Sequence, residues 1–252
     1  MRSTRTLVRL VLFFLSFVLA FGEAGAPGPV TPMQNGAKPR AMVIGFVGGF
    51  VKQDARAHST VQVVEHLRNE YREGVYVQSF ANRQQDRAYK EILRRLDGNN
   101  DGILSPEEKQ NARIVIFGHS WGASETVNLA RKLKRDGIPV LLTIQVDSVA
   151  KLGQNDSVIP ANVGQAVNFY QPDGIVHGRP QIRAENPART EILGNFRYDY
   201  KTNPIRCEGY PWFDRVLVKA HTEIECDPKV WSQVESLIYQ KLSPPTRDTA
   251  AR

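Results

Sequence analysis

From residue 41 onward, short apolar runs alternate with longer stretches in which apolar residues recur every three or four positions. The short runs predict buried strands, and the longer stretches predict helices with one buried face. The predicted strands are 41–46, 75–79, 113–118, 139–146, 166–171 and 216–219, and the predicted helices are 59–72, 86–96, 123–135 and 230–242. We interpret residues 182–200 as a β-hairpin region.

Alternation of strands and helices predicts a mostly parallel sheet of about six or more strands with helices on both faces. The expected fold class is therefore α/β, a three-layer sandwich. The pattern continues without a break in composition, so we expect one domain over residues 41–243.

The first residues of the chain have a different pattern. Three arginines precede an apolar stretch over residues 10–21, and small residues follow it. This arrangement is typical of a secretory signal peptide, here residues 1–22. The stretch is short for a bilayer span, which needs about 20 apolar residues. We expect export to the periplasm or the medium with no membrane span left after cleavage; the alternative is an uncleaved N-terminal anchor.

Removing the predicted signal peptide changes the charge balance. The whole chain has a formal charge of +7, but residues 1–22 contain three arginines and no acid, which leaves +4. The remaining basic residues are scattered, so a nucleic-acid-binding surface is not indicated. Residues 23–40, rich in Pro, Gly and Ala, predict a flexible leader, and residues 244–252 a C-terminal tail.

Export also bears on the two cysteines, Cys207 and Cys226. An oxidising compartment favours a disulfide between them. On the chain-entropy model such a bridge contributes about 3 kcal/mol. The alternative is two free buried thiols.

Residues 118–122 read Gly-His-Ser-Trp-Gly, between a predicted strand and a predicted helix. The pattern G-x-S-x-G needs this context, because the serine must stand on a sharp turn above the sheet edge. Gly118 and Gly122 leave room for the turn, and the N–H of Trp121 at the helix start can stabilise an oxyanion. In these residues the chain resembles the α/β-hydrolase serine esterases and lipases. The order of elements extends the resemblance over most of residues 40–243.

The resemblance implies a triad in the chain order serine, acid, histidine, with Ser120 as nucleophile. The family places its base where His221 lies, after the last predicted strand, whereas His177 lies in a polar loop. Two acids remain open. Asp147 directly follows an apolar strand, where a buried charge demands a partner. Asp173 occupies the commoner family position, but in a Pro-Asp-Gly turn that needs no function. We favour Asp147.

A Gly-Gly turn follows the first predicted strand, in the region where the family places its second oxyanion donor. Gly49 and Phe50 are therefore candidates beside Trp121, and a simple tight turn is the alternative. Residues 174–213 hold many aromatic residues. They form either a small lid over an apolar acyl pocket or a hairpin that packs its aromatic residues on the body.

Residues 97–108 fit the pattern D-x-[DN]-x-[DN]-G-x₅-E, which resembles an EF-hand calcium loop. The expected ligands are Asp97, Asn99, Asp101, Ile103 through its carbonyl, Ser105 and Glu108. Residues 105–108 also read as a capping box with proline at the first helical position, which is a competing local interpretation. We expect modest affinity and a structural role remote from Ser120, and no organic cofactor.

The sequence thus favours an exported serine hydrolase that cleaves small-molecule or lipid carboxylic esters and is stabilised by calcium. Two alternatives remain: an amidase or peptidase with the same triad, and a non-catalytic exported calcium-binding protein on a hydrolase scaffold. The motif at Ser120 does not distinguish ester from amide leaving groups.

Overall fold

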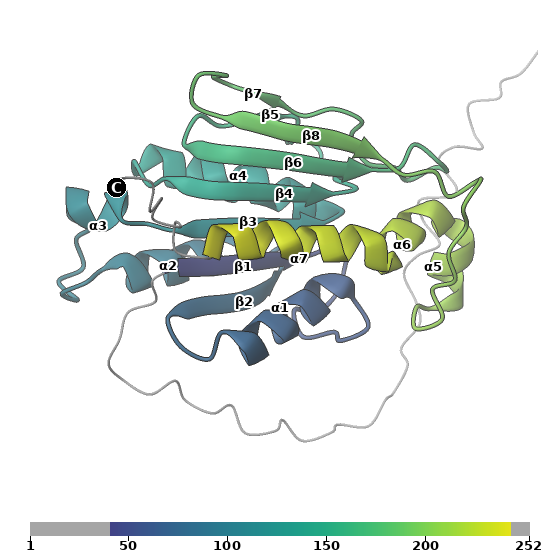
Figure 1. Cartoon of the computed structure of the whole chain (residues 1–252), viewed down its shortest axis with the longest axis horizontal. Helices are drawn as coiled ribbons and strands as arrows, with labels where there is room; N and C mark the ends of the chain where they lie inside the picture. The colour runs from purple at the N-terminus through teal and green to yellow at the C-terminus, as the bar shows by residue number, and fades with distance from the viewer. Residues whose placement is uncertain (1–40, 243–252) are drawn as a thin grey trace, which may run out of the picture. The chain divides into compact units, whose positions relative to one another are not determined.

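The computed structural model describes residues 41–242, except the side chain of Phe213, and its centre is a parallel sheet (Figure 1). The strand order is β2-β1-β3-β4-β6-β8, and every neighbouring pair is parallel. These strands are β1 (Ala41–Val47), β2 (Val75–Ala81), β3 (Ile114–His119), β4 (Val140–Val146), β6 (Val163–Tyr170) and β8 (Glu191–Arg197). A second small sheet pairs β5 (Val158–Ile159) with β7 (Arg183–Ala184). The predicted signal peptide, leader and tail lie outside the described residues.

Helices cover both faces of the large sheet (Figure 1). One face carries α1 (Ser59–Glu70) and α7 (Pro228–Leu242), and the other carries α2 (Gln85–Leu96) and α4 (Trp121–Arg135). Three short helices lie beyond the ends of the strands. Helix α3 (Pro106–Gln110) lies where β3 begins, and α5 (Trp212–Leu217) and α6 (Lys219–Cys226) lie at the opposite end, where the strands end (Figure 1). The architecture is the predicted three-layer α/β sandwich, similar in design to an α/β hydrolase.

Strand β3 explains why the apolar runs lack alternation. Ile114 and Ile116 belong to the core under α2 and α4, whereas Val115 and Phe117 belong to the core under α1 and α7. Successive side chains of a strand point to opposite faces, so a strand covered on both sides is apolar throughout. All four residues are fully buried.

Two sequence predictions about the last third of the domain are wrong. Residues 216–219 are not a strand, since they end α5 and begin α6. A four-residue apolar run does not distinguish a strand from a helix. Pro211 at the N-cap and Asp214 in the first turn are the local signals that favour a helix start here. Residues 182–200 are not a hairpin, because β7 and β8 each pair in parallel with an earlier strand.

Four aromatic residues of the 174–213 segment, Phe196, Tyr198, Tyr200 and Tyr210, pack on the body of the domain, whereas Trp212 is 69% exposed on α5. Phe196 stacks on Phe169 of β6, with ring centroids 5.4 Å apart. Tyr200 is buried and its hydroxyl donates to Asp227 at 2.9 Å. Phe196 and Tyr200 belong to β8 and the segment after it, so these two residues are part of neither the predicted hairpin nor a lid.

A disulfide joins Cys207 to Cys226, as predicted, with Cα atoms 5.8 Å apart. It ties the end of α6 to the segment that precedes α5. Within residues 41–242, no helix has the length and hydropathy that crossing a bilayer requires.

Candidate active site

Ser120 lies on the sharp turn between β3 and α4, at the edge where the parallel strands end (Figure 1). Its backbone has φ 57° and ψ −126°, a conformation that a residue with a side chain rarely adopts. Its N–H donates to the carbonyl of Val146 on β4 at 3.0 Å. This bond to the neighbouring strand helps to hold the strained turn in place.

The two glycines of the motif are required by close backbone contacts. A Cβ atom on Gly122 would lie 2.2 Å from the carbonyl oxygen of Phe46, because α4 begins directly on β1. A Cβ atom on Gly118 would lie 2.6 Å from the backbone of Gly122. The sequence interpretation that both glycines make room for the turn is confirmed.

His221 connects Ser120 to Asp147. Its Nε2 lies 2.8 Å from Ser120 Oγ, and its Nδ1 lies 2.6 Å from Asp147 Oδ2. Sequence reasoning expected His221 directly after a strand, but it lies on α6. The structure therefore brings together the three predicted residues through a different element.

Asp147 is fully buried at the end of β4, with a left-handed φ of 47°. Besides His221, its carboxylate accepts hydrogen bonds from the N–H of Gly178 at 2.7 Å and from the backbone and side chain of Gln171 at 3.1 and 2.8 Å. These hydrogen bonds replace the hydration that the carboxylate loses on burial. Sequence analysis missed Gln171 and Gly178, because only the fold brings them to Asp147.

The other candidates lie apart from this chain of hydrogen bonds. Asp173 is paired with Lys201 at 3.2 Å, and its backbone N–H donates to the side chain of Gln171. His177 is exposed and contacts the carbonyl of Gly174 at 3.4 Å. Neither contacts His221 or Ser120 through a hydrogen bond in the described part of the chain.

The Gly-Gly turn after β1 lies against Ser120. A Cβ atom on Gly48 would come 2.9 Å from the Cβ of Ser120. The side chain of Asn82 donates to the carbonyl of Gly49, which has a left-handed φ of 46°. The ring of Phe50 meets that of Trp121 edge to face at 5.5 Å. The turn that holds the predicted oxyanion candidates Gly49 and Phe50 therefore lies against Ser120 at Gly48 and against Trp121 at Phe50.

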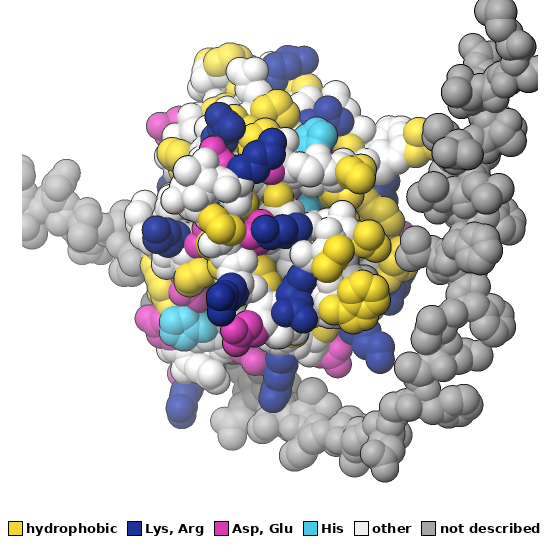
Figure 2. Space-filling view, turned by 90° about the vertical axis from the view of Figure 1, so that its right-hand side faces the viewer, with side chains coloured by type: hydrophobic (Ala, Val, Ile, Leu, Met, Phe, Trp, Pro, Cys, Tyr) yellow, Lys and Arg dark blue, Asp and Glu magenta, His cyan; other side chains and the backbone are white. Residues whose placement is uncertain are grey.

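Large apolar side chains are exposed on the segments at this edge of the sheet. Phe50 is 83% exposed in the turn after β1, and Trp212 is 69% exposed on α5. The others are Leu152, Ile175, Val216 and Leu217. Figure 2 views this side of the molecule, and apolar side chains lie there beside Lys and Arg. We call these six residues the apolar rim.

The predicted calcium loop lies at the opposite edge, between α2 and β3 (Figure 1). Its bend is at Gly102, with φ 81°, and the N–H of Gly102 donates to Asp97 Oδ2 at 2.9 Å. The carboxylate of Glu108 accepts from the N–H groups of Gly98 and Ser105. The two ends of the loop therefore meet. The competing capping-box interpretation is confirmed, since Ser105 and Glu108 cap α3 reciprocally.

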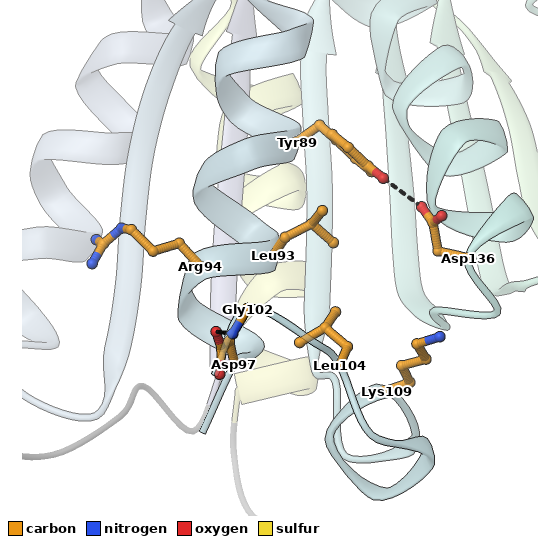
Figure 3. Close-up of a pocket in the computed structure, with 8 residues that line it drawn as sticks. All are labelled: Tyr89, Leu93, Arg94, Asp97, Gly102, Leu104, Lys109 and Asp136. Atoms are coloured by element: carbon orange, nitrogen blue, oxygen red, sulfur yellow. Dashed lines mark hydrogen bonds between the residues drawn. The ribbon is translucent and has the colours of Figure 1, made fainter. Parts of the chain in front are cut away.

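The loop packs on α2 beside an open pocket of 410 Å³ (Figure 3). Leu93 and Leu104 line the pocket and pack on the core. The hydroxyl of Tyr89 donates to Asp136 at 2.7 Å. Within residues 41–242 no group of three or more His, Cys, Asp or Glu side chains is already arranged to hold a metal ion. The donor chemistry of the loop suits Ca²⁺. The Glu108 carboxylate, however, would have to turn from the backbone N–H groups toward the ion.

No protein-family model and no curated protein matches the chain. Among solved structures, an iodinated complex of acetyl xylan esterase has 11% identity and a TM-score of 0.39, over 82% of this chain and 100% of that one. A thermostable esterase from Pseudomonas putida has 11% identity and a TM-score of 0.40, over 80% and 73%. The RedJ thioesterase of Streptomyces coelicolor has 12% identity and a TM-score of 0.37, over 78% and 97%. Similarity this remote gives no information on activity, which has to come from the site itself.

Proposed function

We propose that the chain is a serine hydrolase that cleaves carboxylic esters. One observation carries the proposal: the unbroken chain of hydrogen bonds from Ser120 through His221 to the buried Asp147. A serine hydroxyl becomes a nucleophile when an adjacent base takes its proton, and the base in turn needs an orienting acid.

In the proposed mechanism Ser120 Oγ attacks the ester carbonyl while His221 Nε2 takes its proton. Asp147 holds the Nδ1–H of His221 and stabilises the imidazolium that forms. The N–H of Trp121, at the start of α4, and an N–H of the turn at Gly49 and Phe50 donate to the oxyanion. His221 then gives the proton to the leaving alcohol. Water attacks the acyl carbonyl while His221 takes its proton, and that proton passes to Ser120 Oγ as the bond to the acyl group breaks and the carboxylic acid leaves.

The apolar rim favours esters with an apolar acyl or alkyl group as the substrate class. Six large side chains are exposed on the segments around Ser120, and their contact with an apolar substrate would remove both surfaces from water. An amidase or peptidase with the same residues remains the second candidate, since the site geometry alone does not select the leaving group.

The test is a series of p-nitrophenyl esters against a series of aminoacyl anilides, with Ser120→Ala as control. We expect turnover of the esters, little turnover of the anilides, and a fluorophosphonate adduct on Ser120 that the variant lacks. Preferred hydrolysis of anilides would favour the amidase alternative. Absence of both turnover and adduct at neutral pH would favour a non-catalytic exported calcium-binding protein.

We further propose that residues 97–108 bind Ca²⁺ with a structural effect. Asp97, Asn99, Asp101, the carbonyl of Ile103, Ser105 and Glu108 would supply the oxygen ligands. Titration calorimetry should give a calcium-binding heat that Asp97→Ala abolishes. Glu107→Gln, which changes an exposed neighbour outside the ligand set, should leave the heat unchanged. An unaltered heat in Asp97→Ala contradicts the proposal.

Export through the signal peptide at residues 1–22 is also proposed. The Cys207–Cys226 disulfide supports it, because disulfides persist in oxidising compartments. N-terminal sequencing of protein recovered outside the cytoplasm should start at residue 23 or 25. A start at residue 1 or 2 would instead indicate the uncleaved anchor.

A further inference from the structure

A second buried carboxylate lies next to the proposed triad. Glu225 is four residues after His221 on α6, so both side chains lie on the same side of that helix. Its Oε1 is 2.6 Å from His58 Nδ1, at the start of α1, and its Oε2 is 3.4 Å from His119 Nδ1, in the turn before Ser120. None of these three residues has a part in the mechanism above.

The contact between Glu225 and His58 shifts the pKa of each residue toward its charged form. Burial lowers the pKa of His58, but the hydrogen bond and charge of Glu225 and the nearby Asp214 outweigh burial and raise it above its ordinary value. Burial raises the pKa of Glu225, but the imidazoles of His119, His58 and His221 outweigh burial and hold it below its ordinary value. Tyr210 also faces the pair, with its ring 5.2 Å from that of His58.

Such a pair requires an explanation other than stability. Apolar residues of equal volume often stabilise a fold as well as a buried ion pair does, because both charges lose their hydration. Glu225 nevertheless joins three elements of the site: the helix that carries His221, the turn that carries Ser120, and the start of α1.

His119 transmits this contact to the catalytic ring. Its imidazole lies over that of His221, with centroids 4.6 Å apart and planes 34° apart. Burial lowers the pKa of His119 to about 4, so the ring is neutral near pH 7 and does not repel the imidazolium that forms on His221. Its Nδ1 faces Glu225, and Glu225 therefore limits where the ring can move.

Helix α6 is short, and further contacts anchor its C-terminal end, where Glu225 lies. The hydroxyl of Ser59 donates to the carbonyl of Glu225 at 2.6 Å, and the disulfide at Cys226 follows directly. These contacts fix the end of the helix, one turn after His221. The carboxylate contacts with His58 and His119 additionally fix its rotation about its own axis.

We propose that Glu225 is a positioning residue that holds the imidazole of His221 in line with Ser120 and Asp147 through its contacts with His58 and His119. The proposal rests on the proposed hydrolase function. A displacement of about 1 Å at a catalytic group costs up to about 100-fold in rate. Loss of the Glu225 contacts should therefore lower kcat, while KM, which depends on the substrate side of the site, should change little.

The experiment compares four single-residue variants of the full-length protein with the wild type. His58→Ala removes the donor to Glu225, His58→Asn retains an N–H donor near the position of Nδ1, and Glu225→Gln removes the charge but keeps the shape. The matched control is Glu125→Gln, which alters a carboxylate of similar burial that is paired with Lys151 at 2.8 Å. Within residues 41–242 the hydrogen bonds of its side chain go to Asn128, Lys151 and Gln154 and not to Ser120, His221 or Asp147. Measurements are melting temperature, kcat, KM and the rate of fluorophosphonate labelling.

We expect His58→Ala to lower kcat and the labelling rate by about 10- to 100-fold with KM within about two-fold of wild type. Asn at residue 58 should restore most of the loss, and Glu225→Gln should give a smaller loss than His58→Ala. Glu125→Gln should lower the melting temperature but leave kcat unchanged. Folded His58→Ala and Glu225→Gln variants with wild-type kcat and labelling rate would overturn the proposal, as would a loss of kcat in Glu125→Gln that matches theirs.

A readout without substrate separates this proposal from the proposed function. The proton shared by His221 and Asp147 should give a low-field proton resonance. We expect that resonance to shift or broaden in His58→Ala and to recover in His58→Asn, even if the wild type cleaves no ester. An unchanged resonance in both His58→Ala and Glu225→Gln would overturn the positioning role whether or not the protein is a hydrolase.

Discussion

Asp147 illustrates at the scale of single residues how a buried charge is accommodated. Its carboxylate accepts hydrogen bonds from His221, from Gly178 and from both the backbone and side chain of Gln171. Asp173 instead lies beside Lys201. The two acids that the sequence left open therefore have different surroundings, and substitution should separate them.

Asp147→Asn should lower kcat by roughly 10⁴-fold, because an amide does not stabilise the imidazolium and favours the wrong histidine tautomer. Asp173→Asn should stay within a few-fold of wild type, because Asp173 has no hydrogen bond to His221. Steady-state kinetics on the best p-nitrophenyl ester compares the two. The reverse order of losses would assign the acid to Asp173.

Gln171 should be the most sensitive supporting side chain. Its Nε2 donates to Asp147 at 2.8 Å and to the carbonyl of Val176 at 3.0 Å. Gln171→Met preserves volume but leaves both acceptors without that donor, and a buried unsatisfied polar group costs about 1–3 kcal/mol. We expect a loss of that size in urea unfolding together with a lower kcat. An unchanged unfolding free energy would mean that water replaces the amide.

His119 and His58 should together give the fold an optimum of stability near neutral pH. The pKa of His119 falls from an ordinary 6.5 to about 4, so the unfolded chain binds more protons than the native state between these values. Stability is then lost as the pH falls from 6.5 toward 4, by roughly 3 kcal/mol. The raised pKa of His58 has the opposite sign: its contribution is present below pH 6.5 and is lost as the pH rises.

Urea unfolding of wild type and His119→Gln between pH 4 and 8 tests this expectation. The variant lacks the buried histidine, so its stability should fall less steeply between pH 6.5 and 4. Equal slopes for both proteins would show that His119 is not the group responsible. The descending limb above pH 6.5 should remain in the variant, because His58 is retained.

At the scale of elements, the strand–turn–helix around Ser120 leaves no space for a side chain at residues 118 and 122. The carbonyl of Phe46 on β1 lies where a side chain on Gly122 would be. Gly122→Ala should therefore force α4 away from the sheet and destabilise the fold by about 3 kcal/mol or more. Gly209→Ala is the control, since a Cβ atom there meets nothing within 4 Å. Similar unfolding midpoints for the two variants would contradict this explanation.

The same elements show how far the sequence predicts the structure. The apolar runs of β1, β2, β3, β4 and β6 are long or lie next to clear turns, and the predictions for them are correct. The run at 216–219 is too short to set its own conformation. Pro211 and Asp214 favour a helix start before it, and burial begins only at Ala220 on α6. Strand β8 contains Gly194 and Asn195, which are poor strand formers, so only its pairing with β6 identifies it.

The candidate site divides in the same way. Ser120 was predictable because its motif is local. His221 was predictable because only two histidines, His177 and His221, follow Ser120 in the chain. Gln171 and Gly178 were not, since they contact Asp147 across 24 and 31 residues. Glu225 contacts His58 across 167 residues. No spacing in the sequence reports contacts that only the completed sheet and helices create.

At the scale of the whole molecule, the sheet separates the proposed catalytic site from the proposed calcium loop. Ser120, His221 and Asp147 lie where the strands end, and the loop at 97–108 lies where β3 begins (Figure 1). A strand rises about 3.3 Å per residue, so the length of β3 alone puts roughly 20 Å between the loop and Ser120. An ion at that distance is too far to polarise a carbonyl at Ser120, and its effect has to act through stability.

Calcium should therefore raise the melting temperature without changing kcat. At a concentration ten times the dissociation constant, binding to the native state alone adds about 1.4 kcal/mol, which corresponds to a rise of about 3–5 °C for a domain of this size. Scanning calorimetry with and without a chelator should show this rise in the wild type and not in Asp97→Ala. Ester turnover, measured well below both melting temperatures, should be equal with calcium and with chelator. A kcat that depends on calcium at constant melting temperature would contradict the structural role and would require contact between the loop and Ser120 that this sheet does not permit.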